Sequence, residues 1–84
     1  MIRILFFAKI RDEVGVSECE LDASEGFHDV ATLVAALSAK LGEAAREVLS
    51  RPNVVVAVNH EVVERDQQIQ NGDEVAFYPP VTGG

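Results

Sequence analysis

The chain has 84 residues, 48% of them hydrophobic and 25% charged, which suffices for one small domain with a core and excludes a second. Asp and Glu number 14 and Lys and Arg number 7, so the net charge at pH 7 is -7. A negative net charge cannot neutralise the phosphates of nucleic acids or of anionic lipids. We therefore expect neither nucleic acid nor a membrane as a partner, and a basic protein surface fits better.

Two strands are predicted at the start of the chain. Residues 1–8 include an unbroken apolar run with two phenylalanines, which is typical of a largely buried strand. Residues 9–14 are charged and lead to Gly15, which predicts a turn. Residues 17–22 alternate polar and apolar side chains, which indicates a second strand, antiparallel to the first.

Helical signals follow. Asp29 is a suitable N-cap for a helix that ends at Gly42. The apolar residues between them have helical spacing: Val30, Leu33, Val34, Leu37 and Leu41. Residues 43–49 predict a shorter helix, which ends before Pro52 because a proline disfavours helix at the residue preceding it.

The rest of the chain predicts three more strands. Consecutive valines in residues 53–59 favour a buried strand at a central position, and a short strand is expected around residues 62–63. Residues 74–78 alternate as a last strand after a turn at residues 71–72. This order predicts an α+β domain with a mixed sheet and one main helix packed on one face. It is the order of the ubiquitin-like β-grasp fold.

The last six residues predict a tail. Two consecutive prolines end the last strand, because neither can donate a ladder hydrogen bond, and they favour an extended exit. We therefore divide the chain into a β-grasp domain at residues 1–78 and an extended tail at residues 79–84. The tail can enter a pocket on another protein. The residues expected to insert are Pro80, Val81, Thr82 and Gly83, with the terminal carboxylate on Gly84.

An exposed apolar patch is predicted on one face of the sheet. Phe6 and Phe7 are consecutive, as are Phe77 and Tyr78, so the two members of each pair point to opposite faces of a strand. The helix covers only one of these faces. We therefore expect Phe7, Val62 and Tyr78 to form a patch on the other face that binds a partner; the alternative is that one or more of them is a core residue or a single surface hydrophobe.

Metal and disulfide chemistry find no support in the sequence. Cys19 is the single cysteine, so it cannot form an internal disulfide, and we expect it to pack as a structural residue. His28 is expected just before the helix and His60 in a turn, at a spacing unlike that of zinc ligands. We expect no bound metal.

The apolar run at residues 4–8 is too short for a signal-peptide core or a membrane span, which predicts a cytoplasmic protein.

The charged residues near the last strands predict a solvated face, with steering of a partner as the alternative. They are Glu61, Glu64, Asp66, Asp73 and Glu74.

Two segments resemble a known family. The ending NGDEVAFYPPVTGG (residues 71–84) and the segment ILFFAKIRDEVG (residues 4–15) are similar to the small, sulfur-carrier subunits of molybdopterin synthase, the MoaD family of ubiquitin-like β-grasp proteins. The stretch VVVAVNHEVV (residues 54–63) lies in the expected order between them. The resemblance covers nearly the whole chain.

The resemblance implies a covalent role for the tail. It implies that an ATP-dependent, E1-like activating enzyme adenylates Gly84, which then becomes a C-terminal thiocarboxylate (1-thioglycine). A sulfurtransferase or cysteine desulfurase would supply the sulfur. The tail would insert into the large subunit of molybdopterin synthase, in a heterotetramer of two large and two small subunits. The sulfur would pass to cyclic pyranopterin monophosphate to form the molybdopterin dithiolene. This chain would bind no cofactor and contribute no catalytic side chain.

Two other functions stay open. A sulfur carrier for thiamine synthesis or another thiolation pathway would share the Gly-Gly ending and its activation. A β-grasp interaction module without covalent chemistry would instead tolerate residues added after Gly84. The chain length and the ending FYPPVTGG (residues 77–84) favour the molybdopterin role.

Overall fold

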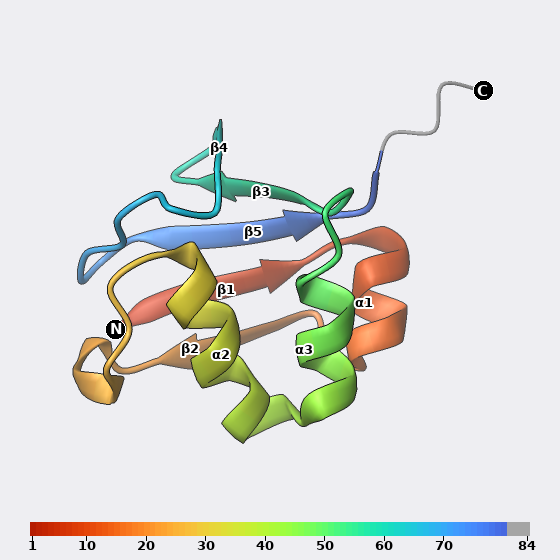
Figure 1. Ribbon diagram of the computed structural model, residues 1–84, viewed down its shortest axis with the longest axis horizontal. Coiled ribbons are helices and arrows are strands. Elements are labelled where there is room, and N and C mark those ends of the chain that lie inside the picture. Colours follow the sequence, from red (N-terminus) through yellow and green to blue (C-terminus); the bar gives the residue numbers. More distant parts are fainter. Residues whose placement is uncertain (81–84) are drawn as a thin grey trace.

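Two parallel strands, β1 (Ile2–Phe6) and β5 (Glu74–Tyr78), lie side by side within a mixed five-stranded sheet (Figure 1). The structure is a computed structural model, and it describes residues 1–80. The other elements are α1 (Ala8–Val14), β2 (Glu18–Leu21), a 3-10 turn (Ala23–Glu25), α2 (Val30–Leu41), α3 (Glu43–Leu49), β3 (Val55–Val58) and β4 (Glu61–Val63). The strand order is β2-β1-β5-β3-β4, and the pairs other than β1 with β5 are antiparallel. The predicted mixed sheet and β-grasp arrangement are confirmed.

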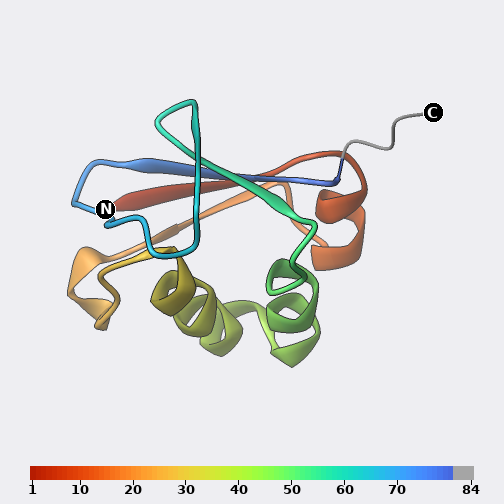
Figure 2. The same ribbon diagram turned by 45° about the horizontal axis from the view of Figure 1, so that its top comes forward.

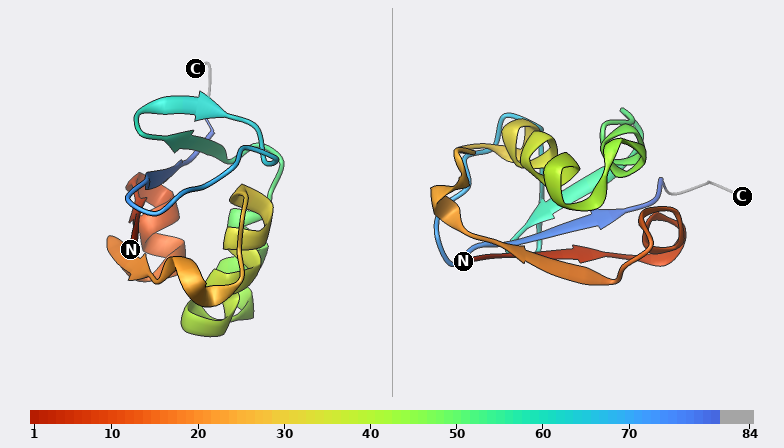
Figure 3. Two further views of the ribbon diagram at one scale, coloured as in Figure 1. Left: turned by 90° about the vertical axis from the view of Figure 1, so that its left-hand side faces the viewer. Right: turned by 90° about the horizontal axis from the view of Figure 1, so that it is seen from below.

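The hydrophobic core lies between the sheet and two helices, α2 and α3, which cover the same face (Figures 2 and 3). Alternate residues of β1 point into the core, because side chains alternate across a strand: Ile2, Ile4 and Phe6 are at most 2% exposed. The predicted main helix is confirmed as α2, and α3 packs beside it. Within residues 1–80, no helix is long and apolar enough to cross a membrane.

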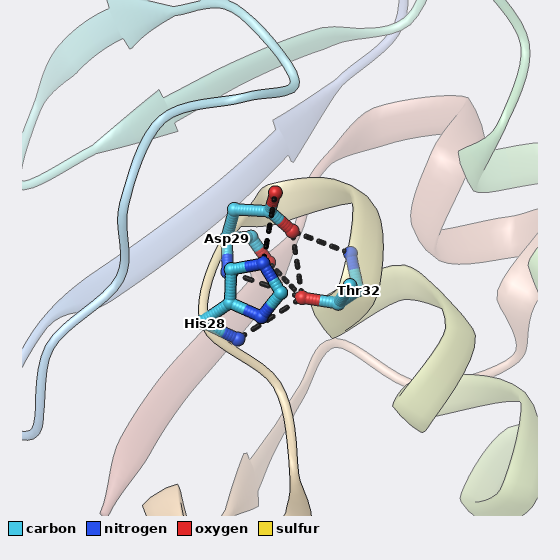
Figure 4. Close-up of polar contacts among 3 residues, drawn as sticks. All are labelled: His28, Asp29 and Thr32. Carbon is cyan, nitrogen blue, oxygen red and sulfur yellow. Dashed lines mark hydrogen bonds and ion pairs between the residues drawn. The ribbon is translucent and has the colours of Figure 1, made fainter.

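The start of α2 is fixed by a reciprocal capping contact (Figure 4). The side chain of Asp29 accepts a hydrogen bond from the backbone N–H of Thr32 at 2.9 Å. In return, Thr32 Oγ1 accepts hydrogen bonds from the backbone N–H groups of His28 and Asp29, at 3.0 and 3.1 Å. These contacts satisfy N–H groups that have no partner within a helix. The predicted start of the helix at Asp29 and its end at Gly42 are confirmed.

The sequence predicted no helix at residues 9–14, and this was wrong, because the segment is helical and belongs to α1. Ile10 and Val14 are four residues apart and so lie on one side of the helix, where Ile10 is buried in the core and Val14 packs against it. Lys9, Arg11 and Asp12 are exposed, whereas Glu13 is half-buried and pairs with Arg51 at 3.0 Å. The first strand consequently ends at Phe6, two residues before the predicted end. Gly15, in a left-handed conformation with φ 95°, ends the helix as a glycine readily does.

The valine-rich strand β3 is interior, but it is not the middle strand of the sheet. It lies between β5 and β4, and β5 takes the middle position. Continuous hydrophobicity therefore indicated a buried, interior strand correctly, but it did not show which interior strand lies in the middle of the sheet. A two-residue turn joins β3 to β4, with Asn59 and His60 both at positive φ (51° and 71°). The predicted turn at His60 is confirmed.

Candidate functional site

Two stacked aromatic rings stand on the sheet face that α2 and α3 leave open. Strands β1 and β5 are parallel with Phe6 opposite Phe77, so the next residues, Phe7 and Tyr78, also lie side by side. Their ring centroids are 4.7 Å apart and their planes differ by 3°. Phe6 and Phe77 stack separately in the core, with centroids 5.8 Å apart. The predicted division of the four aromatic residues between the two faces is confirmed.

The stacked rings form part of an apolar groove of about 630 Å³. Val55 of β3 lies opposite Tyr78 in the sheet, and Val62 of β4 is 70% exposed. The lining residues are Phe7, Ala8, Val55, Val62, Tyr78, Pro79 and Pro80. The groove thus brings together the three predicted patch residues and the first two residues of the predicted tail. It lies at the end of the sheet where β5 finishes beside α1 (Figure 1).

Sequence reasoning missed two residues of the groove, Ala8 and Val55. Val55 belongs to a run in which all the neighbouring residues are apolar, so no alternation shows which face it occupies. Its place follows from its register with Tyr78, which only the sheet pairing reveals. Ala8 carries no signal in the sequence beyond its small size.

Phe7 occupies the N-cap position of α1 without capping it through its side chain. Ser, Thr, Asp and Asn are favoured at this position because their side chains accept hydrogen bonds from the first turn. The backbone carbonyl of Phe7 accepts a hydrogen bond from Ile10 N–H at 3.1 Å, as the carbonyl of any N-cap residue can. Phe7 as a whole is 38% exposed, and it lines the groove. The requirements of the helix therefore do not explain an aromatic residue here, and the groove does.

The predicted tail is only partly described. Pro79 is half-buried and Pro80 is exposed, and both line the groove. The predictions for Val81, Thr82, Gly83 and Gly84 concern residues outside the described range. The described part therefore places the base of the tail against the aromatic groove.

Cys19 lies half-buried in β2, as predicted for a structural residue. Burial raises the pKa of its thiol above the usual range, which is partly offset by the nearby charge of Lys40. A raised pKa lowers the fraction of thiolate at neutral pH, and the thiolate is the nucleophilic form. Residues 1–80 contain no group of three or more His, Cys, Asp and Glu placed to hold a metal ion.

The predicted solvated acidic face divides into two groups. Glu61, Glu64 and Asp66 are exposed as predicted. Asp73 and Glu74 are half-buried, which the prediction of a solvated face did not foresee, and the carboxylate of Asp73 accepts hydrogen bonds from Asn59 Nδ2 at 3.0 Å and from Gln70 N–H at 2.8 Å. Asp73 therefore stabilises two turns, while the exposed residues provide negative charge at the surface.

Comparison with known proteins identifies the family. A family model described as the ThiS family matches residues 4–84. The chain belongs to the ThiS family. Two relatives of this ThiS-family chain are named molybdopterin synthase sulfur carrier subunit: one from Escherichia coli is 40% identical and one from Haemophilus influenzae is 36% identical. Each match covers 100% of both chains.

A solved structure supports the fold of this ThiS-family chain. It is a complex of subunits 1 and 2 of the molybdopterin-converting factor from Helicobacter pylori, in which one chain matches with a TM-score of 0.66 and 24% identity. The match covers 99% of this chain and 97% of the other. At this identity the likeness shows a shared β-grasp fold.

Proposed function

We propose that the chain is the sulfur-carrier subunit of a molybdopterin synthase. The observation that supports this most directly is the similarity, over the full length of both chains, to two proteins with that name. The family model alone does not separate this role from sulfur delivery in thiamine synthesis or another thiolation pathway. The names of the relatives favour the molybdopterin role over these alternatives.

The proposed reaction takes place at the carboxylate of Gly84. One of its oxygens attacks the α-phosphate of ATP in an E1-like activating enzyme, which releases pyrophosphate and leaves a glycyl adenylate. A persulfide from a sulfurtransferase or cysteine desulfurase then attacks the acyl carbon, and AMP leaves. A thiol reduces the remaining S–S bond and releases the thiocarboxylate, whose sulfur passes to cyclic pyranopterin monophosphate. We propose in addition that the protein acts in the cytoplasm, where it is a cosubstrate of these enzymes.

We also propose that the aromatic groove binds the large synthase subunit, in a complex of two large and two small subunits. The Helicobacter pylori protein of similar fold forms a complex of subunits 1 and 2, which supports a partner of this kind. Exposed aromatic side chains are enriched in protein interfaces, since they bury a large area at a small cost in side-chain entropy. The groove adjoins Pro79 and Pro80, so a partner seated on it could also receive the tail.

Changing the tail beyond Gly83 tests the proposal. Deleting Gly84, or adding one alanine after it, should abolish sulfur transfer and leave the melting temperature unchanged, because residues at a chain end make few core contacts. Intact-protein mass spectrometry would show whether each chain exchanges one oxygen for sulfur. Dithiolene formation would be measured with the large subunit and cyclic pyranopterin monophosphate.

The outcomes separate the alternatives. Full activity of the extended variant would contradict the sulfur-carrier role and favour a noncovalent interaction module. A thiocarboxylated wild-type chain that forms no dithiolene with the large subunit would favour another thiolation pathway.

A further inference from the structure

Ala8 has an unusual backbone conformation at the edge of the groove. Its φ is 52°, in the left-handed region that residues with a Cβ atom rarely adopt. The other non-glycine residues at positive φ within residues 1–80 are Asn59 and His60, which form the tight turn between β3 and β4. Ala8 lies instead at the junction of β1 and α1. Conformations of this kind persist only where the surrounding structure imposes them.

The residues on both sides of Ala8 are held in place by other parts of the fold, and they impose the left-handed conformation on Ala8. Phe7 still belongs to the sheet, because its N–H donates to the carbonyl of Phe77 at 3.1 Å. Its own carbonyl already accepts from the helix, from Ile10 N–H at 3.1 Å and Arg11 N–H at 3.4 Å. Ile10 is 2% exposed and anchors the helix in the core. The chain therefore passes from an exposed ring on the open face to a buried side chain in the core within three residues.

We propose that Ala8 is a positioning residue for partner recognition. Its left-handed backbone allows Phe7 to remain in the sheet and stack on Tyr78 while α1 turns back to bury Ile10. A bulkier residue at this position that disfavours positive φ more strongly than alanine does would shift the junction and move Phe7 off Tyr78. The part of this inference that concerns partner binding rests on the proposed function; the part that concerns ring stacking does not.

Asparagine and glutamine at position 8 form a matched test. Both carry an amide, but asparagine tolerates the left-handed region and glutamine does not. We expect Ala8→Asn and Ala8→Gly to melt at or above the wild type, because both residues adopt positive φ more readily than alanine, and Ala8→Gln to melt lower by on the order of 4 °C. If the backbone conformation at position 8 were irrelevant, Ala8→Asn and Ala8→Gln would have similar melting temperatures.

Tyr78 supplies a direct measure of the stacking. It is the single tyrosine in a chain without tryptophan, so the near-ultraviolet circular dichroism band of tyrosine comes from it alone. We expect Ala8→Gln to reduce this band toward the value of a Phe7→Leu reference, and Ala8→Asn and Ala8→Gly to preserve it. A full band in folded Ala8→Gln, or a reduced band in all three variants, would overturn the positioning role.

The same pair of substitutions at Ala35 serves as the control. Ala35 is exposed in the middle of α2 and does not have positive φ. Glutamine is the better helix former, so Ala35→Asn should melt lower than Ala35→Gln. The order of the two variants should thus reverse between positions 8 and 35. The same order at both positions would contradict the inference.

Binding to the large subunit completes the test. We expect Ala8→Gln to bind at least about fivefold more weakly than Ala8→Asn, with the effect in the dissociation rate. Equal affinities would overturn the role in recognition. If even the wild type fails to bind, the proposed function is wrong, whereas the melting and dichroism results still decide whether Ala8 positions Phe7.

Discussion

Individual polar side chains in this protein act mainly on the nearby backbone. Asp29 and Thr32 cap α2, and Asp22 accepts a hydrogen bond from Ser24 N–H at 2.9 Å at the start of the 3-10 turn. In both aspartates, hydrogen bonding to the carboxylate lowers the pKa below its ordinary value. For Asp29 the largest cause is the hydrogen bond from the Thr32 side chain, followed by that from the Thr32 backbone. Folding therefore favours the charged form of these groups.

The capping contact predicts a pH-dependent stability. Asp29→Ala should lower the melting temperature by a few degrees near neutral pH, because Thr32 N–H loses its acceptor. The folded-state pKa of Asp29 is lowered, so its contribution is complete above the unfolded pKa of about 3.9 and is lost as the pH falls through the folded value. Thermal melts of both proteins from about pH 6 to about pH 2 should therefore show the difference shrinking with acid.

Asp12→Ala is the control for this prediction. Asp12 is an exposed carboxylate of α1 whose nearest cation, Arg11, is 3.8 Å away. Its removal should leave the melting temperature close to that of the wild type. A difference for Asp29→Ala that stays constant down to the lowest pH would show that the cap does not depend on the carboxylate charge.

At the scale of elements, the segment after β4 holds the helices and β3 together. The guanidinium of Arg65 donates to the backbone carbonyls of Leu49, Arg51 and Val54, at the end of α3 and just before β3. A cation is favourable at the C-terminus of a helix, where carbonyl groups lack partners. The backbone carbonyl of Arg65 also accepts from Ala31 N–H at the start of α2, at 3.0 Å. One residue thus connects both helices to the sheet.

This arrangement predicts a large effect of Arg65 on stability. Arg65→Ala should lower the free energy of unfolding by about 2–3 kcal/mol, because three carbonyls lose a charged donor. Arg65→Lys should have a free energy of unfolding between those of the wild type and of Arg65→Ala. The reason is that an ammonium group cannot reproduce the planar arrangement of N–H donors in a guanidinium. Burial lowers the pKa of Arg65, but an arginine remains charged at any ordinary pH.

Urea unfolding followed by circular dichroism would measure both variants. Arg46→Ala is the matched control on α3, because among residues 1–80 the Arg46 side chain forms an exposed ion pair with Glu43 at 4.0 Å and no side-chain hydrogen bond. It should change the free energy of unfolding by less than about 0.5 kcal/mol. An Arg65→Ala variant as stable as this control would show that the three hydrogen bonds do not stabilise the fold.

At the scale of the whole molecule, one face of the sheet forms the core and the opposite face presents the groove. Figure 3 shows α2 and α3 on the first face, with β1 and β5 running to the end where the described chain finishes. Exposed carboxylates such as Glu64 lie close to the apolar residues of β4. An apolar centre with a charged rim is the usual composition of a protein interface.

The groove predicts that substitutions at its centre change the affinity for a partner, whereas substitutions at its rim change mainly the association rate. Phe7→Asp or Tyr78→Asp should weaken binding to the large subunit by about 2–4 kcal/mol, because a carboxylate would lose its water without gaining a partner. Phe7→Asp should keep the fold, since aspartate is a favoured N-cap residue and the ring is partly exposed. Glu64→Gln should change mainly the association rate, and only at low salt.

Calorimetry at two ionic strengths would measure these affinities, with circular dichroism as the test of folding. Folded Phe7 and Tyr78 variants that bind as tightly as the wild type would exclude the groove as the interface. Recognition would then depend mostly on residues 79–84.

The sequence alone determined the strands, the two main helices and the partition of the aromatic residues. These features depend on periodicity and on contacts between residues close in the chain. Asp29 and Thr32 are three residues apart, and the alternation of Phe6 with Phe7 needs only the geometry of an extended strand. Local rules therefore sufficed for most of the fold and for the patch residues.

The tertiary structure decided the features that join distant residues. The charged segment of α1 is helical because Ile10 finds a place in the core, and Val55 joins the groove because the sheet register sets it opposite Tyr78. The three acceptors of Arg65 are 11 to 16 residues away in the chain. The left-handed backbone of Ala8 results from fixing Phe7 in the sheet and Ile10 in the core at the same time. No local pattern encodes such contacts, because their energy depends on which distant residues the completed fold places against them.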